Sequence, residues 1–163
     1  MAVHRQRYDA VEHTQPIRVI AYARVNEQPA NQARALALQS ERMRQFVLDH
    51  AGWTLVGEFS DMTAGRSDVR LPGLRHSVAE AVADGCDVFL VDSFDRVSRL
   101  MCGFLAVVEE LNRAGVRLWS ATEPFNSGTP SGRFALKVLT AVAEYERVHN
   151  RRERAARARG GCG

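Results

Sequence analysis

The chain has 163 residues, of which 45% are hydrophobic and 25% are charged, and its formal net charge is +3. That size and apolar content allow one domain with a buried core. No stretch approaches the roughly eighteen apolar residues of a membrane span, and residues 1–16 lack the apolar centre of a signal peptide. We therefore expect a cytoplasmic protein with no membrane partner and with a flexible extension at residues 1–16.

The cysteine and histidine patterns argue against two kinds of site. Cys86, Cys102 and Cys162 are odd in number and form no CxxC pair, and the five histidines show no HxxxH spacing. A disulfide framework or a zinc site would need such repeated spacing. We expect no disulfide, no metal and no cofactor.

Strand and helix signals alternate along the chain. Four runs rich in β-branched and aromatic residues predict strands, and they are residues 17–25, 53–61, 86–93 and 116–123. Three segments with apolar residues at helical spacing predict helices, and they are residues 31–52, 72–85 and 100–115. This order implies an α/β domain over residues 17–128, with a mainly parallel sheet of four to five strands flanked by helices.

A long helix is predicted next, over residues 129–160. Thr129 can cap it, Pro130 can begin it, and no helix breaker follows before Gly160. Its apolar stripe consists of Phe134, Val138, Val142 and Tyr145, supported by Ala141 and Val148. A helix of about thirty residues is longer than a four-stranded sheet can cover. We therefore expect an oligomerisation helix, and the alternative is a helix packed wholly on its own sheet. Residues 161–163 form a tail.

The end of this helix is strongly basic. Residues 146–163 hold six arginines against two glutamates, whereas the rest of the chain is nearly neutral. The arginines are Arg147, Arg151, Arg152, Arg154, Arg157 and Arg159. Such a run is the electrostatic footprint of a nucleic-acid contact. The alternative is a solvated helix end that complements the helix dipole.

Charged and polar residues follow three of the predicted strands. They are Arg24 and Asn26 after the first strand, Asp61 and Arg70 after the second, and Asp95, Arg96 and Arg99 after the third. The carboxyl ends of parallel strands share one edge of a sheet. Four arginines at one edge repel each other unless an anion lies among them, and their planar donors match phosphate oxygens. The pattern predicts a site for a phosphate or a phosphodiester.

Four spaced motifs carry a family resemblance. They are Tyr22, Arg24, Val25 and Asn26 with Gln39 beyond; Asp61, Ala64, Gly65 and Arg70; Asp95, Arg96 and Arg99; and Ala143, Glu146 and Arg147. With these motifs in this order, the chain resembles the catalytic domain of the serine recombinases, the family of resolvases, DNA invertases and serine integrases. The resemblance runs from about Ile17 to Gly160.

The resemblance implies an activity and partners. In that family a serine hydroxyl attacks the DNA backbone without a metal or a nucleotide cofactor and leaves a phosphoserine link, while the arginines hold the phosphate. Subunits exchange strands within a tetramer, the long helix forms the dimer and tetramer interface, and its basic end lies along the DNA minor groove. We therefore expect a homodimer or tetramer that binds the DNA phosphate backbone.

Two positions depart from the family pattern. Asn26 stands where the family has its nucleophilic serine, and a carboxamide has no hydroxyl to attack phosphorus. Ala64 lacks the hydroxyl of the second motif, so one hydrogen bond near the phosphate is lost. We expect a chain that no longer cleaves DNA. Ser98 is a weak candidate for a replacement nucleophile, and Asn26 can also be read as an Asx turn or cap that leads out of the strand.

A third departure concerns the end of the sequence. Resolvases and invertases continue after the long helix into a helix-turn-helix, and large integrases continue into a zinc-bearing region, whereas this sequence ends in RARGGCG. The chain is either a fragment of a longer recombinase or a stand-alone domain. We expect weak, largely non-specific and salt-dependent DNA binding.

Three hypotheses follow. The first is a serine-recombinase catalytic domain whose fold is intact and whose activity is lost. The second is a non-enzymatic partner that forms hetero-oligomers with an active recombinase or acts as a regulatory scaffold on DNA. The third is a phosphate- or nucleotide-binding α/β domain that no longer acts on DNA. We favour the first hypothesis as a description of what the protein is. We favour the second hypothesis as a description of what the protein does.

Overall fold

The computed structural model describes most of the chain. The described residues are 15–26, 29–63, 71–98 and 101–160, with side chains described as far as Tyr145 in the last helix. The predicted extension at residues 1–16 and the tail at residues 161–163 therefore lie almost wholly outside the described residues.

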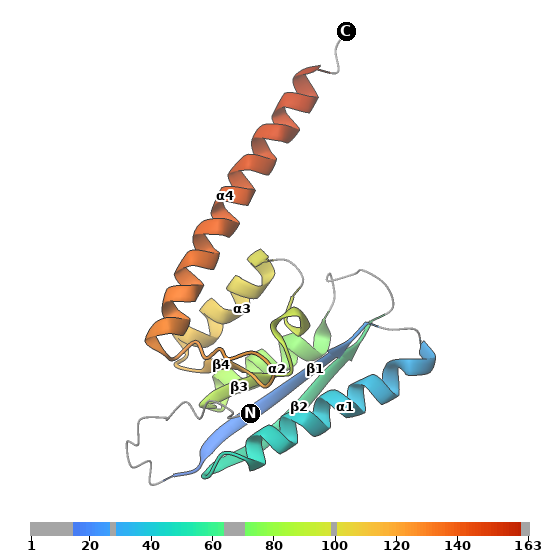
Figure 1. Cartoon of the computed structure of the whole chain (residues 1–163), viewed down its shortest axis with the longest axis vertical. Helices are drawn as coiled ribbons and strands as arrows, with labels where there is room; N and C mark the ends of the chain where they lie inside the picture. The colour runs from blue at the N-terminus through green and yellow to red at the C-terminus, as the bar shows by residue number, and fades with distance from the viewer. Residues whose placement is uncertain (1–14, 27–28, 64–70, 99–100, 161–163) are drawn as a thin grey trace, which may run out of the picture.

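Four parallel strands form the centre of the molecule (Figure 1). The strands are β1 (Ile17–Val25), β2 (Trp53–Met62), β3 (Val88–Val91) and β4 (Arg117–Ser120). Their order across the sheet is β2-β1-β3-β4, and all neighbouring strands are parallel. The predicted α/β class with a parallel sheet is confirmed, with four strands in the described part of the chain.

Helices cover both faces of this sheet. They are α1 (Pro29–Leu48), α2 (Pro72–Ala83), α3 (Met101–Arg113) and α4 (Pro130–Gly160), with one turn of 3-10 helix, η1 (Phe94–Arg96), between β3 and α3. α1 lies on one face, and α2 and α3 lie on the other (Figure 1). The first helix ends four residues before the predicted boundary, because the chain turns through Gly52, whose φ is +80°, to enter β2.

β3 and β4 are shorter than the predicted strands at residues 86–93 and 116–123. After Val91 the carbonyl oxygen of Asp92 accepts hydrogen bonds from the backbone N–H of Thr122 (3.1 Å) and from its hydroxyl (2.7 Å). The Ala121 N–H also donates to the Val91 carbonyl (2.9 Å), so the two segments stay bonded to each other just beyond the strands. This early end lets the chain turn into η1 at the carboxyl edge of the sheet.

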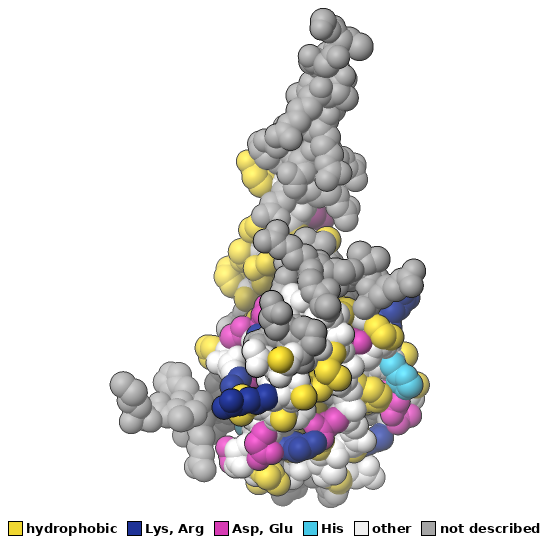
Figure 2. Space-filling view, turned by 90° about the vertical axis from the view of Figure 1, so that its right-hand side faces the viewer, with side chains coloured by type: hydrophobic (Ala, Val, Ile, Leu, Met, Phe, Trp, Pro, Cys, Tyr) yellow, Lys and Arg dark blue, Asp and Glu magenta, His cyan; other side chains and the backbone are white. Residues whose placement is uncertain are grey.

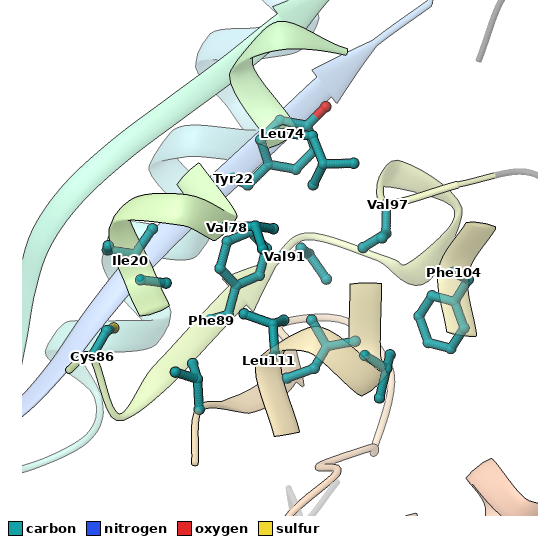
Figure 3. Close-up of a cluster of buried hydrophobic side chains, with 14 of the residues drawn as sticks. Ile20, Tyr22, Leu74, Val78, Cys86, Phe89, Val91, Val97, Phe104 and Leu111 are labelled. Carbon is teal, nitrogen blue, oxygen red and sulfur yellow. The ribbon is translucent and has the colours of Figure 1, made fainter. Parts of the chain in front are cut away.

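The core has two halves, divided by β1. Successive residues of a strand point to opposite faces, and Val19 and Ala21 pack with Met43 of α1. Ile20 and Tyr22 face the other way, toward α2 and α3, as Figure 3 shows. β1 is buried on both faces, and a shift by one residue would exchange these two sets. The packing therefore fixes which residues arrive at the carboxyl end of β1.

α4 begins on the domain and then extends away from it. The Thr129 hydroxyl accepts a 3.0 Å hydrogen bond from the N–H of Gly132, which is the predicted cap. Leu136 is buried in the core near the base of the helix, whereas the rest of α4 continues past α3 and beyond the sheet (Figure 1). In the described ranges, no helix combines the length and the apolar content needed to span a membrane.

Candidate functional site

The candidate site lies at the carboxyl edge of the sheet. In the register of β1 and β2, Arg24 lies directly beside Asp61. η1 carries Asp95 and Arg96 to the same edge. There, Nη2 of the Arg24 guanidinium donates a hydrogen bond to the carbonyl oxygen of Asp95. The structure thus brings together four of the predicted site residues from three separate segments.

Arg24 is the buried centre of this edge, with 3% of its surface exposed. Gln39 of α1 brackets its peptide group, because Gln39 Oε1 accepts from the Arg24 N–H (3.3 Å) and Gln39 Nε2 donates to the Arg24 carbonyl (3.1 Å). Arg96 Nη1 donates to the same carbonyl oxygen at 3.4 Å. The backbone and the guanidinium of Arg24 are both held, so its charge has one orientation.

Arg96 is more open than Arg24, with 30% of its side chain exposed. Its Nη2 lies 3.5 Å from Oδ2 of Asp95, an exposed carboxylate that also accepts a hydrogen bond from the Ser93 hydroxyl. Its Nε is buried and has no hydrogen-bond partner within the described part of the chain. A guanidinium carries five N–H donors, so Arg96 keeps donors for an oxyanion at the edge of the sheet.

Asp61 is engaged in holding the fold together. Its Oδ1 accepts a hydrogen bond from the N–H of Gly73 (2.9 Å), and its Oδ2 accepts from the N–H of Leu74 (2.9 Å) and from the Tyr22 hydroxyl (2.8 Å). These N–H groups belong to the first turn of α2, where backbone donors lack helical partners and a negative charge complements the helix dipole. Asp61 therefore acts as a cap that joins β1, β2 and α2.

The approach of α2 to β2 depends on Gly73. A Cβ atom added at Gly73 would lie 2.4 Å from the carbonyl oxygen of Ser60 and 3.1 Å from Cγ of Asp61. No residue larger than glycine fits there without moving the helix. This close approach is what brings the two N–H groups within reach of the Asp61 carboxylate.

Asn26 is the first residue beyond β1, and it is half-buried. The carbonyl oxygen of Val25 accepts hydrogen bonds from the N–H (3.0 Å) and the hydroxyl (3.3 Å) of Thr63, so β1 and the chain after β2 stay joined up to this point. Asn26 therefore follows Arg24 by two residues at the same edge. A carboxamide there can donate and accept hydrogen bonds but supplies no hydroxyl.

Ser98, the alternative nucleophile, lies against α3. A Cβ atom added at Gly103 would lie 2.6 Å from the Ser98 hydroxyl oxygen and 3.2 Å from its Cβ. The hydroxyl is therefore in contact with the first turn of α3. This position argues against Ser98 as a replacement for the missing serine.

Several predicted residues cannot be placed. Arg70 and Arg99, together with the motif residues Ala64 and Gly65, lie outside the described residues. The structure gives the helical backbone, without side chains, for the predicted DNA-binding residues Arg147, Arg151, Arg152, Arg154, Arg157 and Arg159. The basic end thus continues α4, and the contacts of its side chains stay a prediction.

The predicted apolar stripe of α4 is exposed. The exposed fractions are 68% for Phe134, 47% for Val138, 45% for Val142 and 70% for Tyr145. Figure 2 shows hydrophobic side chains gathered along the described part of α4, above the body of the domain. Burial of such a stripe stabilises a protein by about 25 cal/mol for each Å² removed from water.

Comparison with known proteins identifies the family. The sequence matches the family described as "Resolvase, N terminal domain" over residues 19–161. The chain belongs to the resolvase family. A DNA-invertase of Enterobacteria phage P7 is 34% identical over 129 residues, which cover 79% of this chain and 62% of the phage protein. The transposon Tn552 DNA-invertase BinR of Staphylococcus aureus is 32% identical over 130 residues, with coverages of 78% and 60%.

A solved structure supports the resolvase-family fold. The crystal structure of a resolvase family site-specific recombinase from Streptococcus pneumoniae matches with a TM-score of 0.76 and 25% sequence identity, covering 87% of this chain and 95% of that chain. The chain spans about three fifths of the length of the two DNA-invertases, 62% and 60%.

The resolvase-family domain also has edge residues that the sequence analysis missed. Arg42 of α1 forms a 2.6 Å ion pair with Asp92, whose side chain is almost fully buried at the end of β3. Glu123, after β4, accepts hydrogen bonds from the N–H of Phe94 (3.1 Å) and from the Ser120 hydroxyl (2.5 Å). The rule that singled out the charged residues after the first three strands would have found Glu123 if it had been applied to the fourth.

Proposed function

We propose that this chain is a serine-recombinase domain that holds a DNA phosphate but does not cleave DNA. The observation that carries the proposal is Asn26, which follows β1 directly and stands two residues after the buried Arg24. The family resemblance assigns the nucleophilic serine to this position. The lone pair of a carboxamide nitrogen is delocalised into its carbonyl group, so Asn26 forms no ester with phosphorus.

The arrangement of Arg24 and Arg96 supports phosphate binding. The two residues are linked, because Arg24 donates to the Asp95 carbonyl and Arg96 donates to the Arg24 carbonyl. Preorganised cationic donors are the groups that stabilise charge on a phosphoryl centre. In the proposed site Arg24 supplies a fixed positive charge, and Arg96 supplies hydrogen bonds to the phosphate oxygens. No metal or cofactor is needed for this role.

The second motif supports the same conclusion. Ala64 replaces a residue that carries a hydroxyl in the family pattern, so a second polar contact to the phosphate is missing. The loss of one hydrogen bond to a charged group weakens binding by about 1.5–3 kcal/mol. The arginines Arg24, Arg70, Arg96 and Arg99 all remain. The proposed domain therefore keeps the anion site and lacks the reacting group.

DNA is the proposed partner, and α4 is the proposed oligomer interface. The basic end of α4 would contact DNA phosphates without reading sequence. The exposed stripe that contains Phe134, Val138, Val142 and Tyr145 favours a homodimer or tetramer. The same stripe supports a second candidate function, in which this chain enters hetero-oligomers with an active recombinase as a non-cleaving subunit.

A free nucleotide is a less suitable ligand than DNA. Two relatives with more than 30% identity carry the name DNA-invertase, and the arginines of the basic end extend far beyond the length of one nucleotide along α4. A DNA backbone presents phosphates over such a distance, whereas a nucleotide does not.

The experiment that tests this proposal is a search for covalent protein–DNA adducts. Supercoiled plasmids that carry fragments of the genome encoding this chain are incubated with the protein, and the reaction is stopped with detergent and separated on a denaturing gel. We expect no adduct with the wild-type chain. The Asn26→Ser variant, alone or combined with Ala64→Ser, should form one, because it regains the hydroxyl beside Arg24.

Two controls make the outcome specific. Asn26→Ala removes the carboxamide without adding a hydroxyl and should form no adduct. Adding Arg24→Ala to the Asn26→Ser variant should lower adduct formation at least about 100-fold, because a charge on the phosphoryl centre loses its fixed partner. An adduct formed by the wild-type chain would contradict the proposal. If peptide mapping then placed the attached DNA on Ser98, Ser98 would be the replacement nucleophile.

A further inference from the structure

The loop between β4 and α4 is fastened to the turn that carries Arg96. The Phe94 N–H, at the start of η1, donates a 3.1 Å hydrogen bond to Oε2 of Glu123. Within η1, the Arg96 N–H bonds to the Ser93 carbonyl (3.0 Å) and the Val97 N–H bonds to the Phe94 carbonyl (3.0 Å). The orientation of Phe94 therefore determines where the Arg96 backbone lies.

The Glu123 carboxylate has little freedom to move. The buried Ser120 hydroxyl donates to Glu123 Oε2 at 2.5 Å, and the same oxygen of Ser120 accepts from the Glu123 N–H at 3.1 Å. These two hydrogen bonds between Ser120 and Glu123 hold the carboxylate against the end of β4. A hydrogen bond to a charged group in a protected position is among the stronger ones in proteins.

The side chain of Phe94 is held by the same loop. Its ring meets the ring of Phe125 edge to face, with centroids 4.7 Å apart, and lies 5.3 Å from the ring of Phe104 on α3. Aromatic pairs in such arrangements attract each other in addition to the effect of their burial. Both the backbone and the ring of Phe94 are therefore fixed by residues 123–125.

The other end of this loop forms the base of α4. A Cβ atom added at Gly132 would lie 1.9 Å from the carbonyl oxygen of Asn126, so the first turn of α4 is pressed against the loop. The Thr129 N–H and hydroxyl both donate to that carbonyl oxygen, at 3.1 Å and 2.9 Å. One short segment therefore joins the base of the long helix to the Arg96 turn.

We propose that Glu123 is a positioning residue for the phosphate site. Its carboxylate holds the Phe94 end of η1, so that the guanidinium of Arg96 stays beside Arg24 and meets the phosphate. This inference rests on the proposed function and deepens it, because it assigns the orientation of Arg96 to an acidic residue that does not touch the ligand.

Charge and position predict opposite effects of removing Glu123. A carboxylate near an anion site repels the anion. If charge were the only effect, removing the Glu123 carboxylate would strengthen phosphate binding. If Glu123 orients Arg96, removing the Glu123 carboxylate weakens phosphate binding, because an arginine that must be ordered on binding contributes less to the affinity. The sign of the change separates the two roles.

The experiment is a titration of the full-length chain with inorganic phosphate, followed by heteronuclear NMR. We expect Glu123→Ala to weaken phosphate binding roughly fivefold and to speed hydrogen exchange of the Phe94 N–H. Glu123→Gln keeps an oxygen that can accept from Phe94, so its affinity should stay within about twofold of wild type. Glu109→Ala is the matched control, because it removes an exposed carboxylate on α3 that pairs only with Arg113 among the described residues.

The outcomes separate this inference from the proposed function. If Arg96→Ala abolishes phosphate binding while Glu123→Ala binds phosphate as tightly as wild type or more tightly, the positioning role is overturned and the phosphate site stands. If Arg24→Ala and Arg96→Ala leave phosphate binding unchanged, the proposed function fails instead. An unchanged exchange rate of the Phe94 N–H in Glu123→Ala would overturn the positioning role by itself, because that rate does not depend on phosphate.

Discussion

The hydroxyl of Tyr22 donates a 2.8 Å hydrogen bond to Oδ2 of Asp61, and both residues are buried. Tyr22 lies on β1 and Asp61 on β2, and the carboxylate also accepts two N–H groups from the first turn of α2. This contact braces the end of β1 two residues before Arg24. The orientation of the carboxyl edge of the sheet thus depends on a carboxylate that points into the fold.

Replacing Asp61 with Asn should destabilise the protein. The substitution turns one acceptor oxygen into an NH2 donor that faces a donor, either a backbone N–H of α2 or the Tyr22 hydroxyl. We expect the free energy of unfolding to fall by about 2 kcal/mol, as measured by urea denaturation. Tyr22→Phe removes one donor and leaves the helix cap, so it should cost about 1 kcal/mol. Wild-type stability of Asp61→Asn would refute the capping role.

The apolar stripe of α4 should control self-association. Replacing Val138 with Asp places a charge in the proposed interface, and the dissociation constant of the oligomer should rise at least about 100-fold, because an unpaired charge is costly to bury. Sedimentation of the protein over a range of concentrations measures this change. Lys137→Gln, which alters an exposed neighbour on the same helix, should leave the oligomer unchanged. A wild-type chain that is monomeric at all concentrations would exclude the interface.

Removing residues 151–163 should weaken DNA binding and lower its dependence on salt. This truncation deletes five arginines and one glutamate. The slope of the logarithm of affinity against the logarithm of salt concentration should decrease in magnitude by about 4, since each phosphate contact contributes about 0.9. Fluorescence anisotropy with a labelled duplex gives both slopes. Equal slopes for the two proteins would show that the basic end does not touch DNA.

Cys86 should resist alkylation in the native state. Burial raises the pKa of the Cys86 thiol above its ordinary value of 9.0, whereas Cys102 is exposed. Only the thiolate reacts, so iodoacetamide should label Cys102 first and Cys86 after unfolding, as peptide mass spectrometry can show. The unfolded thiol loses its proton before the folded one, so this group lowers stability as the pH rises past 9.0. Cys86→Ala should remove that pH dependence.

The sequence predicts the sheet, the helices and the convergence of Arg24, Asp61, Asp95 and Arg96 on one edge. Hydrophobic patterns and the alternation of strands with helices suffice for this, because the carboxyl ends of parallel strands share one edge. The sequence also predicts the exposed stripe of α4, since its spacing follows one helix face.

The roles of single side chains are harder to predict from the sequence. The sequence places Asp61 at the carboxyl edge of the sheet but does not reveal that its oxygens accept two N–H groups of α2, because that contact depends on how closely Gly73 approaches β2. The position of Glu123 after the fourth strand can be read from the sequence, but its contact with the Phe94 N–H, 29 positions away, cannot. Such contacts follow from the packing of whole elements and not from local spacing.

The central claim is that the edge holding Arg24 and Arg96 binds a DNA phosphate although Asn26 occupies the position of the nucleophile. The most direct measurement is a heteronuclear NMR titration of the full chain with a short DNA duplex, read at the Nε–H groups of Arg24 and Arg96, after which the same sample is run on a denaturing gel. We predict that both arginine signals shift and that every DNA strand stays intact and separate from the protein. A strand joined covalently to the protein, or arginine signals that do not shift at saturating DNA, would contradict the account.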